Sequence, residues 1–168
     1  MNAAIDSGTP PSGRSICLAG PWEQLQQVRS AIEEYLADAD DDLRVAATMA
    51  GLELAENILK HGGGARHDLG WVRLAKREGR VVITAQNRLQ SRMQADAIQK
   101  RLARISREGA RSSYMARMSE VLADPETEES GLGLLRIAYE GGFELSCDVV
   151  GEHVHLSATR RVGNEIPS

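Results

Sequence analysis

The sequence predicts an α+β protein, a two-layer α/β sandwich with a mixed, mostly antiparallel sheet and helices on one of its faces. Segments with apolar residues at helical spacing are interspersed with strand-like segments, and the later strands pair through short turns that contain glycine. Polar and apolar residues alternate within several strands, as expected when helices bury one face of a sheet. With 168 residues, 42% of them hydrophobic and 26% charged, the chain has the size and composition of one globular domain.

The N-terminal part of the chain predicts one strand and two helices. Residues 14–19 form a short apolar run typical of a strand. Over residues 22–37 the apolar side chains recur every three or four positions, which predicts an amphipathic helix. The acidic turn at residues 39–42 can cap the next helix, predicted at residues 43–61, and the glycines at 62–64 end that helix.

The middle of the chain predicts a hairpin followed by two helices. Residues 70–76 and 80–86 are strand-like, and the short connection that contains Gly79 favours an antiparallel pairing. Residues 91–107 and 112–123 carry apolar side chains at helical spacing, so both stretches are predicted helices.

The C-terminal part of the chain predicts one helix and a final hairpin. The helix covers residues 132–139 and ends at Gly141 and Gly142. Residues 143–149 and 154–159 alternate between apolar and polar side chains, which predicts two strands with one face buried.

Charge and terminal composition exclude several classes of protein. The net charge of −4 provides no basic surface for nucleic acid or an anionic membrane, and no apolar stretch approaches the roughly 18 residues needed to span a bilayer. Residues 1–13 lack the pattern of a signal peptide and, like residues 162–168, read as a flexible tail. We therefore expect a single domain over residues 14–161 and a cytoplasmic location.

Two polar residues in the predicted helix at 43–61 are candidates for a functional site. Glu53 and Asn57 are four residues apart, which places a carboxylate and a carboxamide one turn apart on the same helical face. A carboxylate can accept a proton, and a carboxamide oxygen can ligate Mg²⁺. Taken alone, such a pair is more often two solvated positions on a helix. Glu56 is a rival base, but it lies about 100° round the helix from Asn57 and is predicted to be a surface residue.

A second candidate segment is the loop Gly131-Leu132-Gly133-Leu134, which we call the glycine loop. It leads into the predicted helix at residues 132–139. Two glycines can merely shape a loop, and this pattern is common on its own. Considered together with Glu53 and Asn57, the glycine loop indicates the second half of a nucleotide site.

These segments resemble two motifs of the GHKL, or Bergerat-fold, ATPases and kinases. The helix that carries Glu53 and Asn57 and ends at His61-Gly62 resembles the N-box, and the glycine loop resembles the G2 box. The order of the predicted elements fits the histidine-kinase-like ATPase fold of that superfamily. In its small size and its lack of a histidine-phosphotransfer segment, the chain resembles the anti-sigma-factor serine-kinase branch. Within this branch it is most similar to the SiaB-type single-domain regulators.

The resemblance implies a role for each matching residue. Asn57 would bind Mg²⁺, which bridges the phosphates of ATP, and Glu53 would be the general base for a hydroxyl group of a partner protein. The backbone N–H groups of the glycine loop would approach the phosphates. His61 and Gly62 would form the end of the N-box helix near the sugar and the phosphates.

The sequence departs from the family pattern at the G1 box, an Asp-x-Gly-x-Gly segment that binds adenine. Asn87 occupies the position of the aspartate, and no glycine follows it until Gly109. An asparagine oxygen can still accept a hydrogen bond from the adenine amine, but it carries no charge, and the permissive glycine backbone is missing.

Two functions therefore remain open. The first is a regulatory serine/threonine kinase that binds ATP and Mg²⁺ and phosphorylates or sequesters a partner, for which the resemblance suggests a STAS-domain anti-sigma-factor antagonist or a sigma factor. The second is a pseudokinase that has lost adenine recognition and acts as a protein-binding module. Homodimers are common in this branch of the family.

The predicted helices before the glycine loop carry two further patterns. A basic run is interpreted as a solvated helical face, with contact to phosphate or to an acidic partner as the alternative; it consists of Lys100, Arg101, Arg104, Arg107 and Arg111. An apolar stripe from Tyr114 to Leu122 is predicted to pack into the core rather than to dock a partner.

Overall fold

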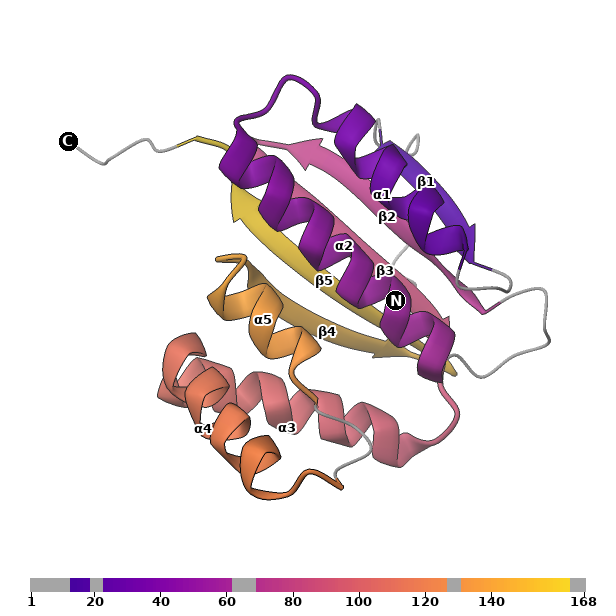
Figure 1. The fold of residues 1–168 in the computed structure, drawn as a ribbon. Coiled ribbons are helices and arrows are strands. Elements are labelled where there is room, and N and C mark those ends of the chain that lie inside the picture. The colour runs from indigo at the N-terminus through magenta and orange to yellow at the C-terminus, as the bar shows by residue number, and fades with distance from the viewer. Residues whose placement is uncertain (1–12, 19–22, 62–68, 127–130, 164–168) are drawn as a thin grey trace, which may run out of the picture.

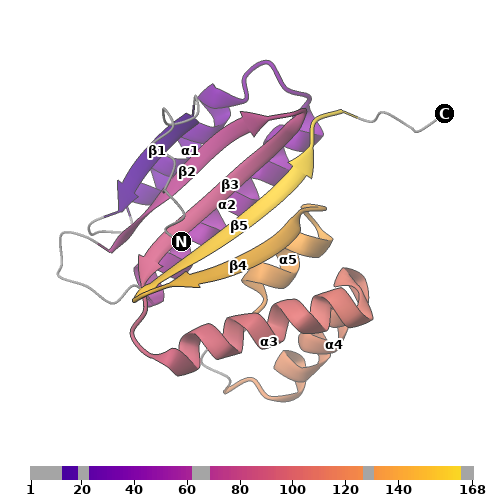
Figure 2. The ribbon, with the colours of Figure 1, turned by 180° about the vertical axis from the view of Figure 1, so that it is seen from behind.

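The computed structural model of the protein describes residues 13–18, 23–61, 69–126 and 131–163. It contains a five-stranded sheet with helices packed on one face, which confirms the predicted α+β sandwich (Figures 1 and 2). Seen from behind, the opposite face of the sheet carries none of the described helices (Figure 2). Within the described residues, no helix is both long enough and apolar enough to cross a membrane.

The sheet has the strand order β1-β2-β3-β5-β4. All four pairings among the described strands are antiparallel, so the sheet is more uniform than the mixed arrangement of the prediction. The two predicted hairpins are confirmed as β2–β3 and β4–β5. The strands are β1 (Gly13–Leu18), β2 (Gly70–Arg77), β3 (Arg80–Arg88), β4 (Glu144–Val150) and β5 (His153–Arg161).

The helices occur in the predicted order, with ends that differ from the predicted ones by at most two residues. They are α1 (Gln24–Tyr35), α2 (Asp41–His61), α3 (Arg92–Glu108), α4 (Ala110–Ala123) and α5 (Gly133–Tyr139). The acidic turn before α2 caps that helix as predicted, because the backbone N–H of Leu43 donates to Asp40 Oδ1 at 2.8 Å.

The core lies between α2 and the sheet. Leu54 and Ile58 of α2 are fully buried in one apolar cluster with Val72 of β2 and Ile83 of β3. Helix α1 packs closely beside α2 because Gly51 has no side chain: a Cβ there would lie 2.2 Å from Ile32 Cδ1. Because the sheet and α1 hold α2 on two of its sides, the polar residues on its remaining face have a fixed position.

Helices α3 and α4 lie beside β4, at the edge of the sheet and next to α5 (Figures 1 and 2). This placement makes the core prediction for the apolar stripe of α4 wrong. Met115 is 53% exposed and Leu122 is 73% exposed, whereas Ser113 is buried. The stripe has the spacing of a core helix, but α4 packs against α3 and α5 instead of against the sheet.

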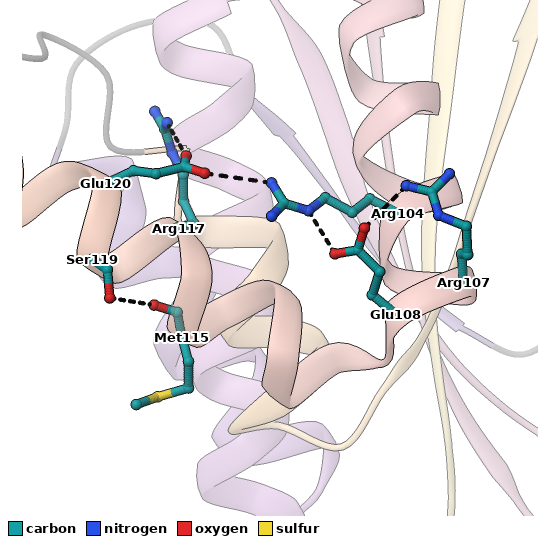
Figure 3. Close-up of polar contacts among 7 residues, drawn as sticks. All are labelled: Arg104, Arg107, Glu108, Met115, Arg117, Ser119 and Glu120. Atoms are coloured by element: carbon teal, nitrogen blue, oxygen red, sulfur yellow. Dashed lines mark hydrogen bonds and ion pairs between the residues drawn. The ribbon is translucent and has the colours of Figure 1, made fainter.

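Ion pairs within and between α3 and α4 neutralise part of the basic run. Figure 3 shows Glu120 of α4 between Arg117 and Arg104, and Arg104 in turn beside Glu108. Nε of Arg104 lies 2.8 Å from Glu108 Oε2, and Nη1 of Arg104 lies 3.6 Å from Glu120 Oε1. Nη1 of Arg117 lies 2.9 Å from Glu120 Oε2. These groups are solvent-exposed, so they contribute little to stability, but they join the two helices into one hairpin.

Candidate functional site

Helix α2 presents Glu53 and Asn57 one turn apart, as predicted, about 100° round the helix from the buried Leu54 and Ile58. The side chains of both residues are half-buried. The neighbouring Glu56 forms an ion pair with Lys60 at 3.3 Å, an arrangement typical of a helix surface. The packing of α2 on the sheet therefore keeps Glu53 and Asn57 available for contacts with other helices.

Glu53 meets α5, the helix that follows the glycine loop. Nη1 of Arg136 donates to Glu53 Oε1 at 2.6 Å, between residues 83 positions apart in the sequence. The second carboxylate oxygen lies over Gly133, where a Cβ would be only 2.7 Å from Glu53 Oε2. The carboxylate is thus held by a cation on one side and fits against the bare Cα of the glycine loop on the other.

Burial raises the pKa of the Glu53 carboxyl above its ordinary value, and the negative charge of Glu56 adds to this effect. The positive charges of Arg136 and Lys60 oppose the rise but do not cancel it. The carboxyl group is therefore a stronger base than an exposed glutamate, which suits a residue that accepts a proton in a reaction.

The glycine loop lies between α2 and α3. Gly131 has φ +60°, a left-handed conformation that favours glycine. A Cβ at this position would lie 2.7 Å from Nη2 of Arg101, so the guanidinium group of α3 covers Gly131. Leu134 is buried and Leu132 is half-buried, which anchors the loop on the core. Glycine at positions 131 and 133 lets the charged side chains of Arg101 and Glu53 approach the backbone of the loop.

The C-terminal end of α2 is closed by α3. Nε2 of Gln94 donates to the backbone oxygen of His61 at 3.3 Å, which satisfies one of the carbonyl groups left free at the end of a helix. The His61 side chain is half-buried. Gly62, the next predicted site residue, lies outside the described residues.

Asn87 is the next-to-last residue of β3, because this strand extends two residues beyond the predicted residues 80–86. Its side chain is buried, and its Nδ2 donates to the backbone oxygen of Arg88 at 3.2 Å. On the neighbouring strand Gly70 has φ +152°. A Cβ at this position would lie 2.1 Å from the backbone oxygen of Gln86 and 3.0 Å from Ile58 Cγ2. Asn87 therefore lies beneath the end of α2, in a site that is neutral and tightly packed.

The structure brings some of the predicted residues together and separates others. Glu53 contacts the glycine loop directly, whereas Asn87 lies with Ile58, one turn before the end of α2. Asn57 lies between these two positions along the helix. The outer face of α2 also carries a groove of about 370 Å³ with Glu53, Glu56 and Arg136 among its lining residues.

The residues of the site fit a magnesium–phosphate group better than a metal ion alone. Among the described residues, no cluster of three or more histidine, cysteine, aspartate or glutamate side chains could hold a metal ion. The oxygen of Asn57 could therefore supply only part of a coordination shell, with phosphate and water oxygens as the remaining ligands. The guanidinium group of Arg101, at the bare face of Gly131, is a suitable donor for a phosphate.

The sequence analysis did not predict Arg136 or Gly70 as site residues, and it did not predict an individual role for Arg101. Arg136 follows Gly133 by three positions, but nothing in the sequence pairs it with Glu53. Arg101 was noted only as one member of the basic run. Gly70 stands at the start of a predicted strand, where an unusual backbone angle leaves no signal in the sequence.

Comparisons with known proteins agree on the fold. No known family model matches the sequence, and no curated protein sequence matches it. A chain in the crystal structure of the SiaB–SiaC complex from Pseudomonas aeruginosa superimposes with a TM-score of 0.68 at 16% identity, covering 89% of each chain. The structure of the RsbU and RsbW domains of Rv1364c from Mycobacterium tuberculosis gives a TM-score of 0.52 at 18% identity, covering 91% of this chain and 33% of that one. The fold expected from the resemblance to SiaB-type regulators is confirmed.

Proposed function

We propose that this protein is a cytoplasmic regulatory kinase of the anti-sigma-factor type, which uses Mg-ATP to phosphorylate a serine or threonine of a partner protein. The observation that carries the proposal is the contact between Glu53 and Gly133. It places a half-buried carboxylate of raised pKa against a glycine loop, with the carboxamide of Asn57 one turn further along α2. A base, a ligand for Mg²⁺ and a phosphate-binding loop are the parts that phosphoryl transfer requires.

Each residue has a defined task in this function. Asn57 would bind Mg²⁺, and the glycine loop and Arg101 would face the phosphates. Mg-ATP supplies the γ-phosphoryl group as substrate. The hydroxyl oxygen of the partner forms a bond to the γ-phosphorus, the bond to the bridging oxygen breaks with release of ADP, and Glu53 accepts the hydroxyl proton.

The partner that we propose is a STAS-domain protein of the anti-sigma-factor-antagonist type or a sigma factor, bound by a monomer or a homodimer of this chain. Support comes from the fold, which is shared with a chain of a SiaB–SiaC complex and with about a third of the RsbU–RsbW chain of Rv1364c. If the protein only sequesters that partner, the same surface would bind the partner and no phosphoryl group would be transferred.

A specific observation favours a second candidate function, a pseudokinase that only binds its partner. Asn87 carries no charge, is buried, and uses its amide to hydrogen-bond the adjacent backbone of its own strand. The end of α2 above it is held by Gln94 of α3. A site built in this way provides little discrimination in favour of adenine.

Calorimetric titration with Mg-ATP and with ADP separates the two candidates. The kinase function predicts measurable binding of Mg-ATP to the wild type. Asn57→Ala should weaken that binding about tenfold, which corresponds to about 1.4 kcal/mol, because the variant loses a metal ligand. Glu53→Ala should retain binding and lose phosphoryl transfer, since the base acts after the nucleotide has bound.

The matched control is Glu56→Gln, which removes a carboxylate from the same helix at a position paired only with Lys60 among its described salt bridges. It should bind Mg-ATP like the wild type. If neither nucleotide produces heat with the wild type, the kinase function is wrong and the binding module remains.

A further inference from the structure

Arg136 is the one cation in direct contact with Glu53 among the described ion pairs. It reaches from α5 to Glu53 Oε1 on α2 at a distance of 2.6 Å. The Glu53 side chain is only 18% exposed, whereas that of Arg136 is 41% exposed. The carboxylate is therefore the buried partner, and the guanidinium group restrains it from the solvent side.

The two oxygens of the Glu53 carboxylate have different environments. Oε1 receives the hydrogen bond from Arg136, and Oε2 points at the bare Cα of Gly133. A carboxylate on a long side chain ordinarily rotates among several rotamers, and one strong charge-assisted hydrogen bond selects one of them. The contact with Arg136 thus leaves Oε2 directed at the glycine loop.

Arg136 is itself held in place from a third helix. Its Nε lies 3.3 Å from Oε2 of Glu140, the residue that follows the last residue of α5. The hydroxyl group of Tyr114 on α4 donates to Glu140 Oε1 at 2.9 Å, and the Tyr114 ring lies 5.3 Å from that of Tyr139. A continuous chain of polar contacts therefore runs from α4 through α5 to Glu53 on α2.

We propose that Arg136 is the positioning residue of Glu53: it directs the free carboxylate oxygen to the glycine loop and links its position to α4 through Glu140 and Tyr114. The inference rests on the proposed function, in which Glu53 accepts the proton of the attacking hydroxyl group. In that reaction Arg136 acts through Glu53 and does not touch the reacting atoms. Its contribution is orientation, because misplacing a catalytic group by about 1 Å can lower a rate about 100-fold.

Carbon-13 NMR titration of the Glu53 side-chain carboxyl group tests the contact without nucleotide. Arg136→Ala should raise the pKa of Glu53 by about one further pH unit, because an adjacent arginine lowers the pKa of a carboxyl group by roughly 1–3 units. Arg136→Lys should restore part of the difference. The other charged groups that act on Glu53, Glu56 and Lys60, are unchanged in both variants.

The control is Arg80→Ala. Arg80 has almost the same side-chain exposure as Arg136, 40% against 41%, and pairs with Glu144 at 3.8 Å on a distant part of the sheet. The Arg80→Ala substitution should leave the pKa of Glu53 unchanged. An unchanged pKa of Glu53 in Arg136→Ala would overturn the proposal.

Turnover of Mg-ATP, followed as ADP released by attack of water, tests the orientation itself. We expect Arg136→Ala to lower kcat about 100-fold at nearly constant KM, Arg136→Lys to recover part of kcat, and Tyr114→Phe to have a smaller effect in the same direction. An unchanged kcat in Arg136→Ala would also overturn the proposal. If the wild type binds no nucleotide, the proposed function fails, and the titration alone decides whether Arg136 orients Glu53.

Discussion

The two ends of the candidate site, both positioned by α2, differ in chemistry. At the glycine loop a half-buried carboxylate meets a guanidinium group and a bare glycine. At the end of β3 the neutral Asn87 is buried beside Gly70, whose Cα also faces Ile58, and its amide donates to the backbone oxygen of Arg88 in its own strand. Under the proposed function, the difference teaches that the phosphoryl-transfer end and the adenine end of the site can change separately, because they face positions of α2 that are more than one turn apart.

The largest effect is expected at the Asn87 end from Gly70→Ala. The backbone at Gly70 has φ +152°, and the new Cβ would lie 2.1 Å from the Gln86 backbone oxygen, which cannot move without breaking the sheet. We expect a loss of about 3 kcal/mol or more in the free energy of unfolding, measured by urea denaturation.

Gly79→Ala is the control for this substitution. Gly79 also has a positive φ, but a Cβ there meets nothing within 4 Å. Its cost should be about 1 kcal/mol, the penalty of the left-handed backbone alone. Equal losses for the two variants would show that Gly70 is not tightly packed.

Gly133→Ala should behave in the opposite way, with a small loss of stability and a large loss of activity. The three atoms nearest to the new Cβ all belong to Glu53, and the one that is too close is a carboxylate oxygen at the end of a flexible side chain, which can move aside. We expect a stability loss below about 1 kcal/mol and a decrease in Mg-ATP turnover of about 100-fold. The double variant Gly133→Ala/Glu53→Gln should turn over no more slowly than Glu53→Gln alone, and additive losses would contradict a shared cause.

Asn87→Asp should sharpen the comparison by restoring a carboxylate at the adenine end. A carboxylate accepts a stronger hydrogen bond from the adenine amine than a carboxamide does, so the affinity for ATP should rise about tenfold, with no change for GTP. Calorimetry on this variant and on Asn87→Ala measures the effect. An equal gain for ATP and GTP would show that Asn87 does not face the base.

The smallest effect is a pH dependence of stability that belongs to Glu53. Burial raises the pKa of this carboxyl group above its ordinary value, so the native state keeps the proton to a higher pH than the unfolded chain does. Its contribution to stability is therefore present at low pH and is lost as the pH rises from about 4.5 through the folded pKa. Urea denaturation between these limits should show this decline in the wild type and not in Glu53→Gln.

Exposed carboxylates act in the opposite direction and must be subtracted. Hydrogen bonds from arginine lower the pKa of Glu108 and Glu120, so any stability they contribute is lost as the pH falls. They are the same in the wild type and in Glu53→Gln. The difference between the two curves isolates Glu53, and a difference that rises with pH would contradict the assigned direction of the shift.

The sequence was sufficient to predict the elements, the two hairpins and the α+β class because those signals are local, whereas the strand order, in which β5 lies between β3 and β4, was not predicted. Helical spacing defined α1 and α2, alternation defined β4 and β5, and the connection containing Gly79 defined a hairpin. The error in α4 has a physical cause: the apolar spacing from Tyr114 to Leu122 indicates a helix face but cannot show whether the sheet or solvent faces it.

The candidate site was predictable only in part. Glu53, Asn57 and the glycine loop could be proposed only together, through their resemblance to the N-box and G2 box, because each pattern is common on its own. The pairing of Glu53 with Arg136 could not be predicted, since it joins residues 83 positions apart through packing that no local pattern specifies. The backbone of Gly70 was equally hidden, because only the approach of the neighbouring strand and of α2 makes a side chain intolerable there.

The central claim is that α2 and the glycine loop form one nucleotide site, and an amide NMR map of Mg-ATP binding tests it most directly. The account predicts that the largest chemical-shift changes occur at residues 53–61 and 131–134 together, that Asn57→Ala weakens both sets, and that omission of Mg²⁺ does the same. Shift changes confined to one of these segments, or located at the distant β1 edge of the sheet, would contradict it.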